Sequence, residues 1–172
     1  MASITDILKQ ARPRERTVMV CIRGDLAGEA ERLTAELART SEDWEPADLT
    51  EEHPGRELAA QLKTVREQIK AAEVPFLLRY IGDRAYSDLL AAHPSDKDTE
   101  LFNSDTFPRA LIAASCVDPV MSEDQAADLF EVITQGQIKA LFDAAWDVHN
   151  SADVVPFSLA ASALLAGLGG ER

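Results

Sequence analysis

The residues best able to do chemistry in this sequence are three histidines and two cysteines, and they stand far apart. His53, His93 and His149 each lie beside a predicted helix break, where a surface or helix-terminal histidine is the usual occurrence. Cys21 and Cys116 fall in apolar runs and follow neither a CxxC pattern nor a metal-ligand spacing. We therefore expect two small buried thiols and neither a nucleophile nor a metal centre.

Carboxylates are the other candidates for chemistry, and they gather in an acidic loop over residues 95–104, SDKDTELFNS. The spacing of its acids is similar to that of a calcium-binding loop. Counted from Asp96, however, the sixth position is Leu101 where that loop needs glycine, and the twelfth is Phe107 where it needs glutamate. We predict a solvated acidic loop. GxSxG, P-loop and HExxH motifs are also missing, so we predict that the chain is not an enzyme and uses no cofactor or metal.

Charge excludes several classes of partner. The formal net charge is −13, and residues 86–172 hold 14 acidic side chains but only 4 basic ones. Binding to phosphates depends on clustered Lys and Arg, so nucleic acid and anionic membranes are disfavoured as partners. No apolar run reaches the roughly 18 residues of a membrane span, and the N-terminus lacks a signal-peptide pattern. We expect a soluble, cytoplasmic protein.

The first half of the chain is predicted to form an N-terminal helical arm (residues 1–15) and a strand–hairpin–strand unit (residues 16–82). The two strands, TVMVCIR and FLLRYI, are rich in β-branched and apolar residues. Between them lie two helices whose apolar residues recur every 3 to 4 positions, which is typical of an antiparallel coiled-coil hairpin. We predict that the two strands pair at the base of this hairpin, against the C-terminal helices.

The second half is predicted to form a helical core (residues 83–153) and an apolar C-terminal tail (residues 154–172). Pro108 suits the first turn of a helix, and Ser122 with Gln125 forms the pattern of a capping box. The predicted fold class is therefore mostly α (α+β), with a C-terminal helical core, a small β element and a helical hairpin inserted between its two strands.

Six apolar side chains are candidate contacts for a partner protein. Two have core spacing in the last predicted helix, where plain burial is the simpler interpretation. The other four lie in the tail, which has almost no charged face and therefore either docks on the core or contacts a partner. The six residues are Phe142, Trp146, Phe157, Leu159, Leu164 and Leu165.

A family resemblance rests on several phrases and their order along the chain: TVMVCIRGDLAGEAERLTAEL, VPFLLRYIGDRAYSDLLAAHPSD, FNSDTFPRALIAASCVDPVMSEDQAADLF and the tail at Val155-Pro156-Phe157. Together they cover most of residues 16–158. In this order they resemble the tail assembly chaperones of long-tailed, siphovirus-type phages, and are most similar to those of actinobacterial phages. The family supplies no residue-level binding motif that could be carried over to this chain.

The resemblance implies a non-enzymatic protein of the host cytoplasm that is absent from the mature virion. It implies binding to the helical tape measure protein, which is kept soluble, and help in recruiting the tail tube protein. Many such chaperones also exist in a frameshifted longer form, and the ending Gly169-Gly170-Glu171-Arg172 is consistent with the short form. The alternative is a structural virion protein such as a head–tail connector or tail completion protein. The sequence leaves a homo-oligomer open, since a lone hairpin stripe would be better buried against a second copy.

Overall fold

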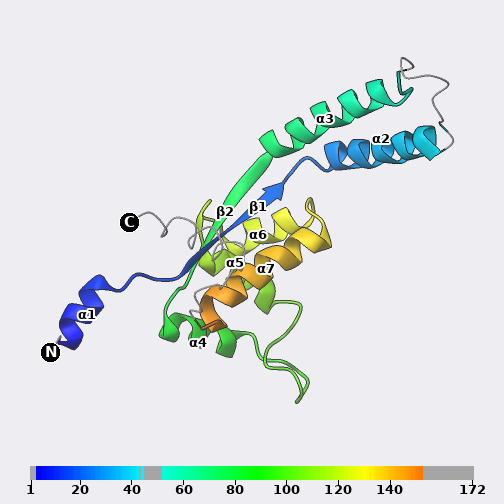
Figure 1. Cartoon of the computed structure of the whole chain (residues 1–172). Coiled ribbons are helices and arrows are strands. Elements are labelled where there is room, and N and C mark those ends of the chain that lie inside the picture. Colours follow the sequence, from blue (N-terminus) through cyan, green and yellow to red (C-terminus); the bar gives the residue numbers. More distant parts are fainter. Residues whose placement is uncertain (1–2, 43, 45–51, 153–172) are drawn as a thin grey trace, which may run out of the picture.

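The computed structural model describes residues 3–42, 44 and 52–152 (Figure 1). Its helices are α1 (Ile4–Gln10), α2 (Gly24–Glu42), α3 (Arg56–Ala71), α4 (Asp83–Ala92), α5 (Phe107–Ser115), α6 (Glu123–Phe130) and α7 (Gln135–Asn150). Its strands are β1 (Glu15–Cys21), β2 (Glu73–Arg79) and β3 (Cys116–Asp118). The described part of the chain is thus mostly helical with one small sheet, and the predicted fold class is confirmed.

The sheet is antiparallel, with the strand order β1-β2-β3. The two predicted strands do pair, as β1 and β2, along their whole length. Both lie two or three residues closer to the N-terminus than predicted, at 15–21 and 73–79 instead of 17–23 and 76–81. The third strand was not predicted, because three residues after a helix carry no readable alternation. It pairs with Leu77 and Leu78 of β2. Pro75, which we expected to precede the strand, lies inside β2. Proline has no N–H to donate to a neighbouring strand. Because β3 does not extend as far as Pro75, no hydrogen bond between β2 and β3 is lost there.

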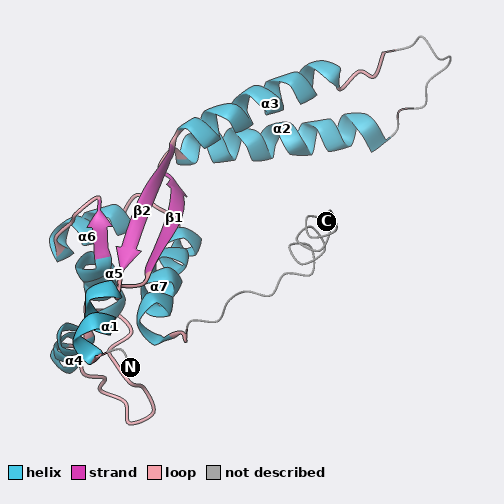
Figure 2. Ribbon diagram, turned by 60° about the vertical axis from the view of Figure 1, so that its left-hand side comes forward, coloured by secondary structure: helices cyan, strands magenta, loops and turns pink. Residues whose placement is uncertain are grey.

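Helices α2 and α3 form the hairpin inserted between β1 and β2, and they extend away from the rest of the molecule (Figures 1 and 2). The seam between the two helices is narrow: Leu33 in α2 is 1% exposed and Leu62 in α3 is 6% exposed, and they are the buried residues of these helices. Near the tip, the ring of Trp44 lies 4.4 Å from that of His53. The hairpin therefore depends on few contacts of its own.

The hydrophobic core lies between one face of the sheet and helices α5 and α7 (Figure 2). Alternate side chains of a strand point to the same face, so every second residue of β1 and β2 turns toward these helices. The core cluster includes Val20, Phe76, Leu78, Phe107, Leu111, Ile112, Leu141, Ala144 and Ala145. The opposite face of the sheet is open, with Met19 52% exposed.

The starts of α6 and α7 are held by capping boxes. In the predicted one, the Gln125 N–H donates to Ser122 Oγ over 3.2 Å, and the Ser122 N–H donates to Gln125 Oε1 over 2.9 Å. Thr134 and Gln137 form a second box, which the sequence analysis missed. The Gln137 amide also donates to the Cys21 carbonyl over 2.8 Å. The start of α7 is therefore fixed to the end of β1.

The C-terminal end of α7 is fixed through the imidazole of His149. Its Nδ1 lies 2.7 Å from the Ala145 carbonyl, and its Nε2 accepts the Ile81 N–H over 3.2 Å. The ring stacks on Tyr86 at a centroid distance of 4.8 Å. Because Nε2 accepts a hydrogen bond, the proton of the neutral ring sits on Nδ1 and is donated to Ala145. Burial lowers the pKa of His149, which favours this neutral form.

Helix α1 lies apart from this core, as Figure 1 shows. Ser3 caps it by accepting the Asp6 N–H over 3.3 Å, but the helix has no buried residue. Its apolar side chains, Ile4, Ile7 and Leu8, are all exposed. None of the helices in the described ranges is both long and apolar enough to cross a membrane.

Candidate partner-binding groove

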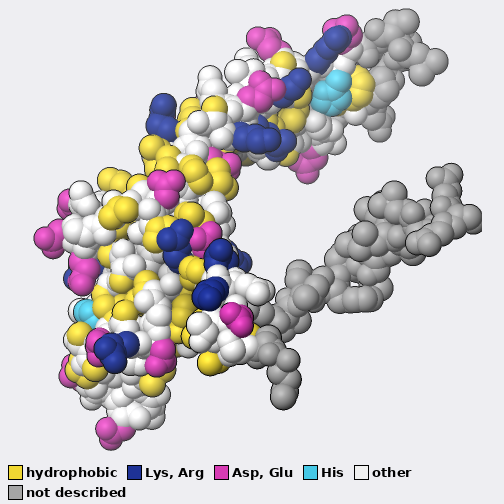
Figure 3. Space-filling model, turned by 90° about the vertical axis from the view of Figure 1, so that its left-hand side faces the viewer, with side chains coloured by type: hydrophobic (Ala, Val, Ile, Leu, Met, Phe, Trp, Pro, Cys, Tyr) yellow, Lys and Arg dark blue, Asp and Glu magenta, His cyan; other side chains and the backbone are white. Residues whose placement is uncertain are grey.

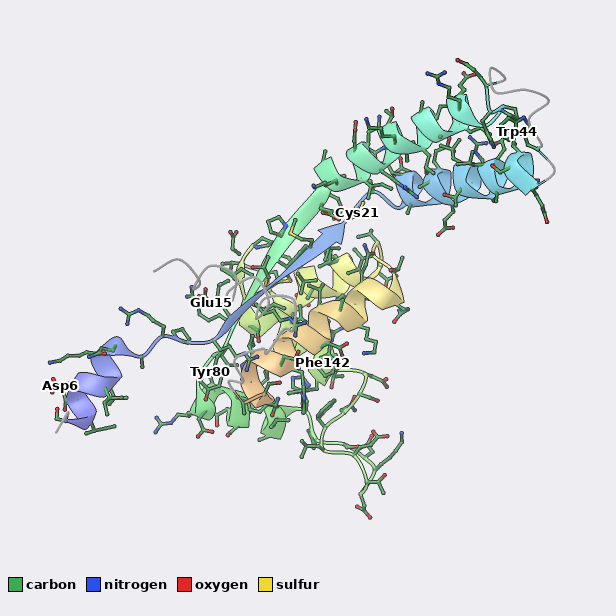
Figure 4. All side chains as sticks on the ribbon, in the orientation of Figure 1. Asp6, Glu15, Cys21, Trp44, Tyr80 and Phe142 are labelled. Carbon is green, nitrogen blue, oxygen red and sulfur yellow. The ribbon has the colours of Figure 1, made fainter. Side chains whose placement is uncertain are left out.

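Two of the candidate contacts, Phe142 and Trp146, lie one turn apart on α7 with their ring centroids 6.0 Å apart (Figure 4 labels Phe142). Both are half-buried and pack against the core. The ring of Phe102 joins them from the loop between α4 and α5, at 6.1 Å from Phe142 and 5.5 Å from Trp146. Phe142 and Trp146 are therefore not fully buried core residues. Part of each ring packs on the core, and the rest remains at the surface.

Phe102 was missed by the sequence analysis, which treated residues 95–104 as a solvated acidic loop. The ring instead packs 4.4 Å from that of fully buried Phe107. The Asn103 N–H next to it donates to the His93 carbonyl over 2.9 Å and closes the base of the loop. The sequence held one signal of this packing, namely an aromatic residue within a run of polar ones. The acidic residues of the loop do remain at the surface, where Lys97 pairs with Glu100 at 2.8 Å.

A groove of about 490 Å³ opens beside Phe142, between α7, the end of α6 and the start of α5. We call it the core groove. Its apolar lining consists of Pro108, Phe130, Ile138 and Phe142, and its polar lining of Ser104, Asp105, Glu131, Gln135 and Lys139. Lys139 is already paired with Asp143 at 2.6 Å. Two other carboxylates, Asp105 and Glu131, therefore set the charge at its rim, and an apolar side chain with a cationic neighbour would fit it.

Phe130 and Ile138 stand at spacings that are typical of a buried helix face. Both do pack against the core, but each is only half-buried and also lines the groove. Periodicity identifies the face of a helix and does not say how far a neighbouring helix covers it. The other four candidate contacts, Phe157, Leu159, Leu164 and Leu165, lie outside the described residues.

Each histidine makes a hydrogen bond in the structure, and each cysteine is buried or half-buried. His93 Nδ1 lies 2.9 Å from the Thr106 hydroxyl, and His53 Nδ1 accepts the Gly55 N–H over 2.9 Å. Cys116 is buried, which raises the pKa of its thiol and disfavours the reactive thiolate. Cys21 is half-buried, so the expectation of a buried thiol holds fully only for Cys116. Among the described residues, no group of three or more His, Cys, Asp or Glu side chains is placed to hold a metal ion.

Comparison of the chain with protein-family models, with curated proteins and with solved structures found no match.

Proposed function

We propose that this protein is a phage tail assembly chaperone that binds the tape measure protein and keeps it soluble until the tail tube is assembled around it. The observation that carries the proposal is the core groove, a cleft on the helical core whose apolar lining side chains are only half-buried. A groove of this kind accepts the apolar face of an amphipathic helix, which is the usual way a helical client is held.

The charge of the chain supports the same proposal. A net charge of −13 keeps a complex soluble through mutual repulsion of its copies. The proposed role places the protein in the host cytoplasm during assembly and outside the mature virion. The tail tube protein and a frameshifted longer form of the chain are its further proposed partners.

Co-expression with the tape measure protein, followed by pull-down and size-exclusion chromatography, tests this function. Wild type should yield a soluble complex. The groove variant I138A/F142A should lose at least about tenfold in affinity, because each truncated side chain forfeits roughly 1.5–3 kcal/mol of apolar burial. The matched control is L89A/L90A on α4, where two half-buried leucines pack on the same core but do not line the groove.

Three results would contradict parts of the proposal. A tape measure protein that is equally insoluble with and without this chain would remove the chaperone function. Ordered copies of the chain in purified virions would favour a structural protein such as a connector or completion protein. Unchanged client solubility after the changes F157A and L164A would exclude the tail as a contact, while leaving the core groove in place.

A further inference from the structure

A second groove lies on the hairpin, far from the core groove along the chain. It has a volume of about 400 Å³, and we call it the hairpin groove. Its lining residues are Leu37, Ala59, Leu62, Lys63, Arg66, Glu67 and Lys70. The apolar members come from the seam between α2 and α3, and all the charged ones come from α3. Figure 3 shows Lys and Arg side chains beside hydrophobic ones along the hairpin.

The bases of the hairpin groove differ from most other bases in the described part of the chain. In the part of the chain that the structure describes, Lys63, Arg66 and Lys70 make no hydrogen bond or ion pair, although the chain has 30 acidic residues for 17 basic ones. Most other described bases find a carboxylate. Arg32, for example, on the facing helix α2, binds Glu29 and Glu36 at 2.8 Å each.

Three unpaired cations on one helix face carry a small energetic cost. Arg66 and Lys70 stand one turn apart, where like charges destabilise a helix by about 0.2–0.5 kcal/mol. Glu67, the single acid among the lining residues, stands four residues after Lys63 and three before Lys70 and offsets part of this cost. Lys and Arg side chains also cover apolar surface with their stems while their charged ends stay in water. The groove therefore has an apolar floor and a cationic rim, and an anionic partner would relieve the repulsion.

The shape of the groove indicates a helix as its occupant. Ala59 and Lys70 are separated by roughly 16 Å of helix at 1.5 Å per residue, which corresponds to about three turns. A helix laid along α3 would cover exposed Ala59 and the exposed part of half-buried Leu37, as a third helix added to a two-helix seam. Acidic residues on the flanks of that helix would meet Lys63, Arg66 and Lys70.

We propose that the hairpin groove binds an amphipathic helix with acidic flanks, supplied by the same client that the core groove binds. The source of this helix rests on the proposed function; its chemistry rests on the unpaired bases. The two grooves then have opposite charge preferences, because Asp105 and Glu131 lie at the rim of the core groove. A client segment with both acidic and basic helices would be held at two points.

Fluorescence anisotropy with a labelled peptide tests the hairpin groove directly. The probe is an amphipathic peptide of about 18 residues with leucines on one face and glutamates on its flanks. The full chain should bind it, and more weakly when salt rises from about 0.05 M to about 0.5 M. The variant K63Q/R66Q/K70Q should bind it about tenfold more weakly and lose most of the salt dependence, because three exposed charge pairs are removed.

Two controls make the result specific. The variant K9Q/R84Q/K97Q removes three exposed bases from α1, α4 and the 95–105 loop, so its net charge equals that of the groove variant. It should bind the probe as wild type does. A peptide with lysines in place of the glutamates should not lose affinity in K63Q/R66Q/K70Q. Equal helicity of both variants by circular dichroism shows that the hairpin is folded.

Equal binding of the acidic probe by wild type and by K63Q/R66Q/K70Q would overturn the inference. So would a dimer of the free chain that dissociates in this variant, because the groove would then hold a second copy. The proposed function fails separately: wild type would then bind the probe but leave the tape measure protein insoluble. A soluble client with no probe binding would remove only the hairpin groove.

Discussion

Replacing His149 with glutamine tests how the end of α7 is fixed to the turn between β2 and α4. The neutral imidazole accepts the Ile81 N–H and lies near the Ala145 carbonyl, while its ring stacks on Tyr86. A second proton on Nε2 would place two donors against each other. Burial lowers the pKa of His149, and the hydrogen bond to Ala145 opposes this more weakly.

The lowered pKa makes stability depend on pH below the ordinary histidine value of about 6.5. In this range the unfolded chain binds a proton at His149 that the folded chain resists, so the free energy of unfolding falls as pH falls. At about pH 5.5 the unfolded state gains at most about 1.4 kcal/mol from this proton, and solvent at the half-buried ring keeps the effect below that limit. Above about pH 6.5 both states are neutral and the contribution vanishes.

A competing effect has the opposite sign. His149 lies in the last turn of α7, where the helix dipole favours a positive charge by about 0.3–1 kcal/mol. Urea denaturation followed by circular dichroism at about pH 7 and pH 5.5 separates the two, because His149→Gln removes the titration and keeps a side-chain acceptor for Ile81. Wild type should lose more stability than His149→Gln on acidification. A smaller loss in wild type would refute the reasoning, as would an NMR titration that places the pKa of His149 above its ordinary value.

Three further changes test the core and the backbone by urea denaturation. Leu141→Ala should lower the free energy of unfolding by about 2–5 kcal/mol, because Leu141 is 0% exposed. Its control Val132→Ala, at 74% exposure, should change it by no more than about 0.5 kcal/mol. Equal losses would contradict the position of the core. Gly82→Ala should cost about 1 kcal/mol or more, since φ is +96° where β2 turns into α4, and an unchanged stability would argue against that backbone conformation. Ser115→Ala should be neutral or stabilising by up to about 1 kcal/mol, because the buried Ser115 hydroxyl has no hydrogen-bond partner within the described residues; a clear loss would reveal one.

Much of the fold could be predicted from the sequence because it depends on local patterns. The strands on either side of the hairpin are runs of β-branched and apolar residues, and the stripes of α2 and α3 repeat about every 3.6 residues. Both patterns are visible within one segment. The capping box at Ser122 is likewise a contact between residues three positions apart. The short strand β3 escaped prediction because its pairing with Leu77 and Leu78 is a property of the sheet, and a segment of three residues shows no period of its own.

At the candidate sites, too, one part of the arrangement could be predicted from the sequence and another part could not. The sequence by itself placed Phe142 and Trp146 on one face of a helix, since residues four apart are neighbours on any α-helix. Only the tertiary structure brought Phe102 against them, because the loop is closed by the bond from Asn103 to His93. Composition likewise determined that acids outnumber bases. The pairing of the bases of α3 with carboxylates depends on the distances between side chains in the folded chain. Distances between different helices and strands cannot be predicted from the order of the residues.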